Sequence, residues 1–238
     1  IPIRRGLSAL DICIMKIVFI SDTHGKHKIL TSKAYNNILG EGDILVHAGD
    51  CTNVGKTHEI KDFLDWFSNT PFTHKVFIAG NHDWGFETNH DISPEYKEKG
   101  VHYLFDNMVD IDGVKIYGSP WQPEFYNWAF NLPRGEKLAE KWAQIPDGLD
   151  ILVTHGPAHG MVDHTIQGQN VGCVDLFDRV LEVKPVIHVC GHIHWAYGQK
   201  TFHGVEFLNA STLNERYQYE NKPIVTEYNP ETKEINYI

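Results

Sequence analysis

The chain has 238 residues and a formal net charge of −10, and 42% of its residues are hydrophobic and 22% charged. These values are typical of a globular protein with a sizeable core, and no apolar run approaches the roughly 18 residues that a membrane-spanning helix needs. A protein that grips long nucleic acid through its phosphates is normally basic, so the acidic balance argues against such a partner. We expect no membrane association, and the sequence carries no signal for an oligomeric state.

Residues 1–14 lack the 7–15-residue apolar core of a signal peptide, and a strand signal begins at Met15. We therefore expect residues 1–14 to be an N-terminal extension or a segment added for expression, and residues 15–238 to form a single domain. The four cysteines form no C-x-x-C pair, so they are expected to be reduced thiols, mostly buried, which favours a cytoplasmic location.

Short apolar runs alternate with helical patterns along the chain. Five β-branched runs predict strands buried on both faces, namely Lys16–Ile20, Asp43–Ala48, Lys75–Ala79, Asp150–Thr154 and Pro185–Cys190. Apolar residues at helical spacing predict helices at His27–Leu39, Thr57–Ser68, Gly135–Gln144 and Asp175–Val183. The repeated order of strand and helix favours a layered α/β domain.

Three hairpins supplement these elements. Turn signals predict the pairs Met108–Ile111 with Val114–Tyr117, Lys200–Phe202 with Val205–Leu208, and Ile224–Tyr228 with Glu234–Tyr237. We expect these hairpins to build a second sheet that packs on the first. The predicted fold is a four-layer α-β-β-α sandwich with two mixed sheets and the helices outside.

Each of the five buried runs ends in a polar cluster. The clusters are Ser21–His24, Gly49-Asp50, Gly80–Asp83, His155-Gly156 and Gly191–His194. In open α/β sheets, ligand sites form outside the carboxyl ends of the strands. One such cluster arises often by chance, but five in succession indicate a shared crevice that holds aspartate, asparagine and histidine side chains.

These residue types predict a metal site. Carboxylate and amide oxygens together with neutral imidazole suit Mn, Fe, Zn or Co. Seven candidate donors exceed the three or four protein ligands of a single catalytic ion, so two ions that share a bridging carboxylate fit the number better.

The ordered set D-x-H, G-D, G-N-H-D, H and G-H-x-H resembles the calcineurin-like binuclear metallophosphoesterase superfamily, over nearly the whole chain after Met15. The segments Gly118–Gly135, Thr154–Pro157 and Val171–Cys173 resemble the metallophosphoesterase domain-containing phosphodiesterases within it. The resemblance implies two divalent metal ions, with manganese favoured over iron, zinc or cobalt, at the carboxyl ends of the strands.

The resemblance also implies a role for each site residue. Asp22, His24 and His194 would bind the first ion, Asp50 would bridge both ions, and Asn81, His155 and His192 would complete the second site. Some animal members carry glycine where this chain has His192, so the histidine here implies a complete and active centre. His82 would act as the catalytic histidine without binding metal, and the neighbouring Asp83 either orients an imidazole or caps a loop.

The expected function is a metal-dependent phosphodiesterase on small cyclic-nucleotide-like or aryl phosphodiesters. A metal-bridging hydroxide would attack phosphorus, with His82 as general acid. A phosphomonoesterase or protein phosphatase is the first alternative, although the sequence that follows Asp50 lacks the arginine of the phosphatase motif G-D-x-V-D-R-G. A DNA-end nuclease and a nucleotide-binding scaffold on the same fold are the others.

Three further expectations concern side chains near this site. The aromatic residues Trp121, Phe125, Tyr126, Trp128 and Phe130 either pack as a cap over the core or give a stacking surface to a substrate. The polar run Asn209–Arg216 is a candidate for the pocket wall. His47 and His188 lie within strands and are expected to be hydrogen-bonded core residues.

Overall fold

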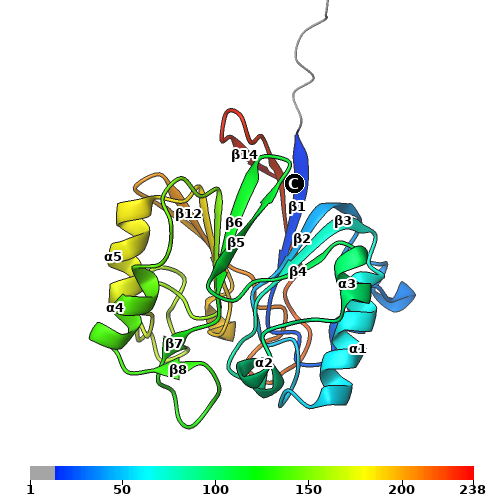
Figure 1. The fold of residues 1–238 in the computed structure, drawn as a ribbon, viewed down its shortest axis with the longest axis horizontal. Coiled ribbons are helices and arrows are strands. Elements are labelled where there is room, and N and C mark those ends of the chain that lie inside the picture. The colour runs from blue at the N-terminus through cyan, green and yellow to red at the C-terminus, as the bar shows by residue number, and fades with distance from the viewer. Residues whose placement is uncertain (1–13) are drawn as a thin grey trace, which may run out of the picture.

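The computed structural model describes residues 14–238 and shows two six-stranded sheets packed face to face, with helices on both outer faces (Figure 1). The interpretation of the segment before Met15 falls on residues outside this range, apart from Ile14. Between the sheets lies a buried apolar cluster to which both contribute, including Phe19 from one and Val189 from the other. The predicted four-layer α-β-β-α sandwich is confirmed.

The first sheet has the strand order β14-β13-β1-β2-β3-β4. Its strands are β1 (Met15–Ile20), β2 (Gly42–His47), β3 (Phe72–Phe77), β4 (Val101–Tyr103), β13 (Ile224–Tyr228) and β14 (Ile235–Tyr237). Strands β1 to β4 run parallel, so their carboxyl ends meet at one edge, whereas β13 pairs antiparallel with β1.

The second sheet has the order β11-β12-β10-β9-β6-β5. Its strands are β5 (Asn107–Ile111), β6 (Val114–Ser119), β9 (Ile151–Thr154), β10 (Ile187–Cys190), β11 (Gly198–Phe202) and β12 (Val205–Asn209). The four central strands are parallel, and a two-stranded sheet of β7 (Gln122–Pro123) and β8 (Asn131–Leu132) lies outside it.

The division of strands between the sheets differs from the expectation. The five buried runs do not form one sheet, because β1, β2 and β3 lie in the first and β9 and β10 in the second. Two hairpins flank β9 and β10, but the third, β13–β14, extends the first sheet. Which strands pair depends on contacts between distant segments, and the local alternation of residues does not record it.

Helices α1 (Thr57–Ser68), α2 (Trp84–Thr88) and α3 (Pro94–Glu98) cover the first sheet, and α4 (Glu136–Trp142) and α5 (Val174–Val183) cover the second (Figure 1). The predicted Thr57–Ser68 helix is confirmed, and its Phe63 and Phe67 pack their rings against Phe77 of β3. The two later helices are present with slightly shifted ends.

The predicted helix at His27–Leu39 is wrong. The segment forms only two short 3₁₀ turns, η1 (His27–Ile29) and η2 (Lys33–Tyr35). Asn36 and Asn37 follow with φ of 55° and 48°, which no α-helix allows. Asparagine competes with helix formation and tolerates the left-handed backbone, and these two residues break the pattern that the apolar spacing indicated.

The core histidines and thiols lie as expected. His47 Nε2 is 2.9 Å from Thr23 Oγ1, and His188 Nε2 is 2.8 Å from Thr154 Oγ1. Cys51, Cys173 and Cys190 are buried free thiols, and Cys13 lies outside the described residues. Within residues 14–238, no helix has both the length and the apolar character needed to cross a membrane.

Candidate metal centre

The seven predicted ligands converge at the carboxyl ends of five strands. The first sheet contributes Asp22, His24, Asp50 and Asn81 from the segments after β1, β2 and β3, and the second contributes His155, His192 and His194 from those after β9 and β10. Six of the seven are buried and His192 is partly buried. The crevice therefore lies between the sheets.

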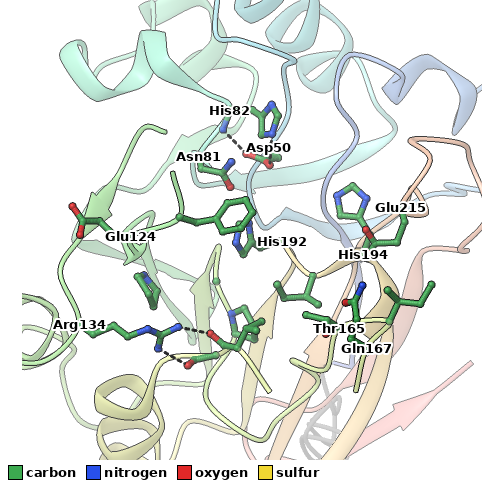
Figure 2. A pocket seen from close by; sticks show the side chains of 18 of the residues that line it. Asp50, Asn81, His82, Glu124, Arg134, Thr165, Gln167, His192, His194 and Glu215 are labelled. Atoms are coloured by element: carbon green, nitrogen blue, oxygen red, sulfur yellow. Dashed lines mark hydrogen bonds and ion pairs between the residues drawn. The ribbon is translucent and has the colours of Figure 1, made fainter. Parts of the chain in front are cut away.

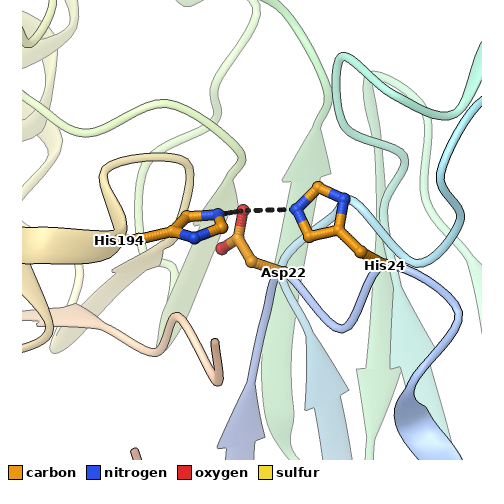
Figure 3. A group of neighbouring side chains, drawn as sticks. All are labelled: Asp22, His24 and His194. Carbon is orange, nitrogen blue, oxygen red and sulfur yellow. Dashed lines mark ion pairs between the residues drawn. The ribbon is translucent and has the colours of Figure 1, made fainter. Parts of the chain in front are cut away.

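One group consists of Asp22, His24 and His194, whose ligand atoms all lie within 4.8 Å of one another. Figure 3 shows the Asp22 carboxylate between the two imidazole rings. Its Oδ1 lies 3.4 Å from His194 Nε2 and 4.0 Å from His24 Nε2. This is the set that the resemblance implies for the first ion.

A second group consists of Asp50, His155 and His192 within the same spread. His155 Nε2 lies 3.3 Å from Asp50 Oδ2 and 3.0 Å from Asn81 Oδ1, so the amide of Asn81 joins the group. These four residues are the set implied for the second ion.

Asp50 stands between the two groups. Its Oδ2 lies 3.3 Å from His155 Nε2 of the second group and 3.7 Å from His24 Nε2 of the first. The backbone N–H of His82 donates to the other oxygen, Oδ1, at 2.8 Å and fixes the carboxylate. The position suits a carboxylate shared by two ions.

Backbone carbonyls orient two of the imidazoles. His155 Nδ1 lies 2.9 Å from the Ala48 carbonyl oxygen, and His194 Nδ1 lies 3.0 Å from that of Asn214. With the proton held on Nδ1, each ring presents Nε2 to the carboxylates, which is the arrangement that metal-binding histidines usually have.

Asp22 is held from two sides. The Ser211 hydroxyl donates to Oδ2 at 2.9 Å, and the backbone N–H of His192 lies 3.0 Å from the same oxygen. Gly191 passes so close to this carboxylate that a Cβ there would overlap it. The Asp22 side chain therefore has little freedom to turn away from the crevice.

The charges of the site shift the pKa of its carboxylates and imidazoles. Burial alone would raise the pKa of both carboxyl groups, but His194 beside Asp22 and His155 beside Asp50 lower it well below the usual range. Burial would lower the pKa of the two histidines, but Asp50 raises that of His155 to about 9, and Asp22 raises that of His194 to about 9. At pH 7 the extra protons on His155 and His194 therefore lie beside the carboxylates, in the positions that a metal cation would take.

His24 and His192 have the opposite shift. Burial lowers the pKa of His24 to about 4 and that of His192 to about 3, so both rings are neutral at pH 7. Among the described residues, neither buried ring nitrogen of His24 has a hydrogen-bond partner. A buried nitrogen without a partner costs free energy, and a divalent cation beside Asp22 and Asp50 would satisfy Nε2. The donor set therefore fits divalent metal.

The backbone of the centre is strained where the ligands attach. Asp22, His24, Asp50 and His192 have positive φ values of 51°, 39°, 55° and 67°. Non-glycine residues rarely adopt this conformation, which costs about 1–3 kcal/mol each and clusters at functional sites. These turns direct the four side chains into the crevice.

His82 lies at the edge of the centre and is partly buried. Its Nδ1 is 2.7 Å from the Asn53 carbonyl oxygen, its Nε2 is 4.0 Å from Asp50 Oδ2, and its ring stacks on Trp128 with centroids 4.2 Å apart. It also forms a possible ligand group with His24 and Asp50, so the geometry allows either a proton-transfer role or a ligand role.

Asp83 is fully buried beneath the loops after β2 and β3. Its carboxylate accepts hydrogen bonds from the Thr52 hydroxyl at 2.7 Å and from the backbone N–H groups of Thr52 and Gly80, both at 2.9 Å. Burial and the charge of Asp50 raise its pKa. These contacts fit the loop-capping alternative, in which Asp83 holds the two ligand-bearing loops together.

A cavity of about 460 Å³ opens beside the ligands (Figure 2). Asp50, Asn81, His82, His192 and His194 form its floor. Its walls include several side chains that the sequence did not single out, namely Glu124, Arg134, Thr165, Ile166, Gln167 and Tyr217. Arg134 donates to the carbonyl oxygens of Val171 and Gly172 at 2.6 and 2.8 Å, which ties two walls of the cavity together.

The aromatic residues between Trp121 and Phe130 divide between the two predicted roles, packing over the core and facing the cavity. Phe130 is buried and Trp121 packs in the core, whereas Phe125 and Tyr126 are exposed. Phe125 lines the cavity with its ring edge-on to His192. In the run 209–216, Glu215 reaches the cavity, and Ser211 and Asn214 contact ligands from behind.

Comparisons with known proteins agree with this geometry. Residues 15–226 match the model of the calcineurin-like phosphoesterase superfamily domain. The human metallophosphoesterase domain-containing protein 1 is 40% identical over 234 residues, covering 88% of this chain and 70% of that protein. The Caenorhabditis elegans UPF0046 protein T07D4.2 is 34% identical over 252 residues, covering 93% and 62% respectively.

Solved structures show the same fold at low identity. The crystal structure of TT1561 of Thermus thermophilus has a TM-score of 0.60 at 12% identity and covers 94% of this chain and 98% of that chain. The family match, the relatives and the Asp/His groups able to hold divalent metal lead to one conclusion. The chain belongs to the calcineurin-like phosphoesterase superfamily.

Proposed function

We propose that the protein is a phosphodiesterase that uses two divalent metal ions. The observation that carries the proposal is the position of Asp50, whose Oδ2 lies within 4 Å of a histidine from each ligand group. Asp22, His24 and His194 would hold one ion, Asn81, His155 and His192 the other, and Asp50 both. Bound there, the two cations would neutralise phosphoryl oxygens and lower the pKa of a water to make a nucleophile near pH 7.

His82 is the residue proposed to move a proton. Its Nδ1 lies 2.7 Å from the Asn53 carbonyl oxygen, so a proton for transfer to the leaving group would be carried on Nε2. The Nε2 atom lies on the cavity side, where the leaving oxygen of a bound ester can accept that proton. The Trp128 ring, stacked on His82 with centroids 4.2 Å apart, holds the imidazole in this orientation.

The charged side chains that line the cavity support the proposal of a diester rather than a monoester as substrate. A phosphomonoester is a dianion near neutral pH, whereas a diester carries one negative charge and a second organic substituent. Apart from histidines, Arg134 is the one basic side chain described as lining the cavity, and its guanidinium already donates to two carbonyls. Glu124 and Glu215 also line it and repel a further negative charge.

Hydrolysis assays test this proposal. Metal-loaded protein should hydrolyse bis-p-nitrophenyl phosphate with a kcat/KM at least about tenfold above that for p-nitrophenyl phosphate, and EDTA should abolish both activities. Faster turnover of the monoester would favour a phosphomonoesterase or protein phosphatase. Absence of turnover with metals loaded would leave a nucleotide-binding scaffold.

Manganese is the metal that we propose from the set Mn, Fe, Zn and Co, all of which suit oxygen and imidazole ligands without thiolate. We also propose that residues 15–238 act as one domain, because each ligand group draws on both sheets. The cytoplasmic location stays a prediction, which the free thiols of Cys51, Cys173 and Cys190 support.

A further inference from the structure

Three exposed apolar side chains lie at the catalytic cavity or at the cavity beside it. Phe125, Ile166 and Trp195 are 51%, 57% and 52% exposed, and each lines a cavity at the metal centre. None of the three belongs to a buried apolar cluster of the described residues. Packing of the fold therefore does not explain them.

A second cavity, of about 580 Å³, adjoins the catalytic one. The two cavities share Ile166, His194 and Glu215 as lining residues, so they adjoin at the first ligand group and together make a groove whose second part is lined mostly by polar side chains. Trp195, directly after the candidate ligand His194, lines the second part. A groove of this size holds far more than a phosphoryl group, since cavities of about 300–1,000 Å³ accommodate drug-sized ligands.

Ile166 lies between the two cavities on a tight turn. The Gly168 N–H donates to the Thr165 carbonyl at 2.8 Å, and the Thr165 N–H donates to that of Gln169 at 2.9 Å. Figure 2 shows Thr165 and Gln167 of this turn on the side of the cavity where His194 and Glu215 lie. Turn positions favour small and polar residues, so the turn itself does not account for an isoleucine there.

We propose that Phe125, Ile166 and Trp195 form an apolar rim that binds an apolar ester substituent of the substrate. This inference rests on the proposed phosphodiesterase function and names its substrate class, a diester with one alkyl chain or planar ring. The phosphate lies at the ligands, and the substituent extends along the groove past His194 and contacts Ile166 and Trp195. Burial of apolar surface supplies affinity there without a further charge.

A series of p-nitrophenyl phosphodiesters tests the rim. The series compares methyl, hexyl and phenyl esters with an ether chain of the same length as hexyl, which is matched in size but more polar. Full burial of one methylene is worth about fourfold in binding, so five half-buried methylenes raise kcat/KM by about 30-fold. The gain should appear in KM rather than kcat. A preference for phenyl over hexyl identifies ring stacking, and the reverse identifies a chain.

Variants then assign the effect to the rim. Ile166→Ala and Trp195→Ala should each reduce the ratio of hexyl to methyl kcat/KM by about threefold or more, with thermal unfolding recorded to check folding. Met108→Ala is the matched control, because Met108 on β5 is 45% exposed and lines neither cavity. Equal kcat/KM for methyl, hexyl and phenyl esters, or a ratio that both rim variants leave unchanged, overturns the inference. Loss of all diester turnover in the unmodified protein would instead refute the phosphodiesterase proposal.

Discussion

The Nε2 atom of His155 lies 3.3 Å from Asp50 Oδ2, although the two residues come from different sheets and are separated by 105 positions in the chain. The Asp50 carboxylate raises the pKa of this imidazole to about 9 despite complete burial. In the metal-free protein a proton therefore occupies the space between them. That space is the one in which we place the second cation.

Replacing Asp50 with alanine removes the carboxylate that both ligand groups share. We expect metal content to fall from two ions per chain to one or none, and diesterase kcat/KM to fall by about 10³-fold or more, since the metals supply several kcal/mol of transition-state stabilisation. Metal analysis by mass spectrometry and steady-state kinetics measure the two effects. Asp110→Ala, on the exposed face of β5, is the control. Two tightly bound ions in the Asp50→Ala protein would contradict the bridging role.

Replacing His82 with glutamine separates proton transfer from metal binding. We expect kcat to fall by about 10²- to 10⁴-fold, the usual range for a lost general acid, with both ions retained. The exposed His58 on α1 gives the control variant His58→Gln. A His82→Gln protein that loses an ion would show that His82 is a ligand with His24 and Asp50.

Replacing Ser211 with alanine removes the hydroxyl that donates to Asp22 Oδ2 at 2.9 Å. Groups that hold a ligand in place typically contribute about 10- to 100-fold to metal affinity, so we expect a loss of that size. Competition with a chelator measures it, and Thr73→Ala on the exposed part of β3 is the control. Unchanged affinity would mean that Gly191 and the His192 N–H suffice to hold Asp22.

Metal binding should release protons in a defined pH range. His155 and His194, each with a pKa of about 9, carry an extra proton at pH 7, whereas a metal ligand must be neutral. Filling both sites at pH 7 should therefore release up to two protons per chain, and affinity should rise with pH until pH passes about 9. His24 and His192, with pKa values of about 4 and 3, are already neutral and release none.

Calorimetry of manganese binding in buffers of different ionisation enthalpy counts these protons. His155→Ala should lower the number released at pH 7 by one, whereas His159→Ala, a change at an exposed histidine outside the centre, should leave it unchanged. A proton count near zero in the unmodified protein would show that Asp50 and Asp22 do not hold protonated imidazoles before metal binds.

The sequence predicted the site better than the arrangement of the sheets. The ligand clusters follow directly after buried runs, so the local pattern and the rule for strand ends predicted that these seven side chains lie close together, whereas their binding of metal stays a prediction. Which strands pair depends on contacts across the whole chain. The prediction therefore placed the hairpin β13–β14 in the second sheet, whereas it lies in the first. Ile166 and Tyr217 line the cavity because distant loops fold over it, and short patterns carry no signal for such contacts.

The origin of the ligands has a mechanical consequence. Asp22 and His24 come from the first sheet and His194 from the second, and the other group is divided in the same way. Each ion would thus link residues of the first sheet to residues of the second. Removal of the metals by a chelator should weaken the contact between the two sheets before either sheet unfolds. Amide hydrogen exchange at the contact between the sheets should therefore accelerate at temperatures at which each sheet remains folded.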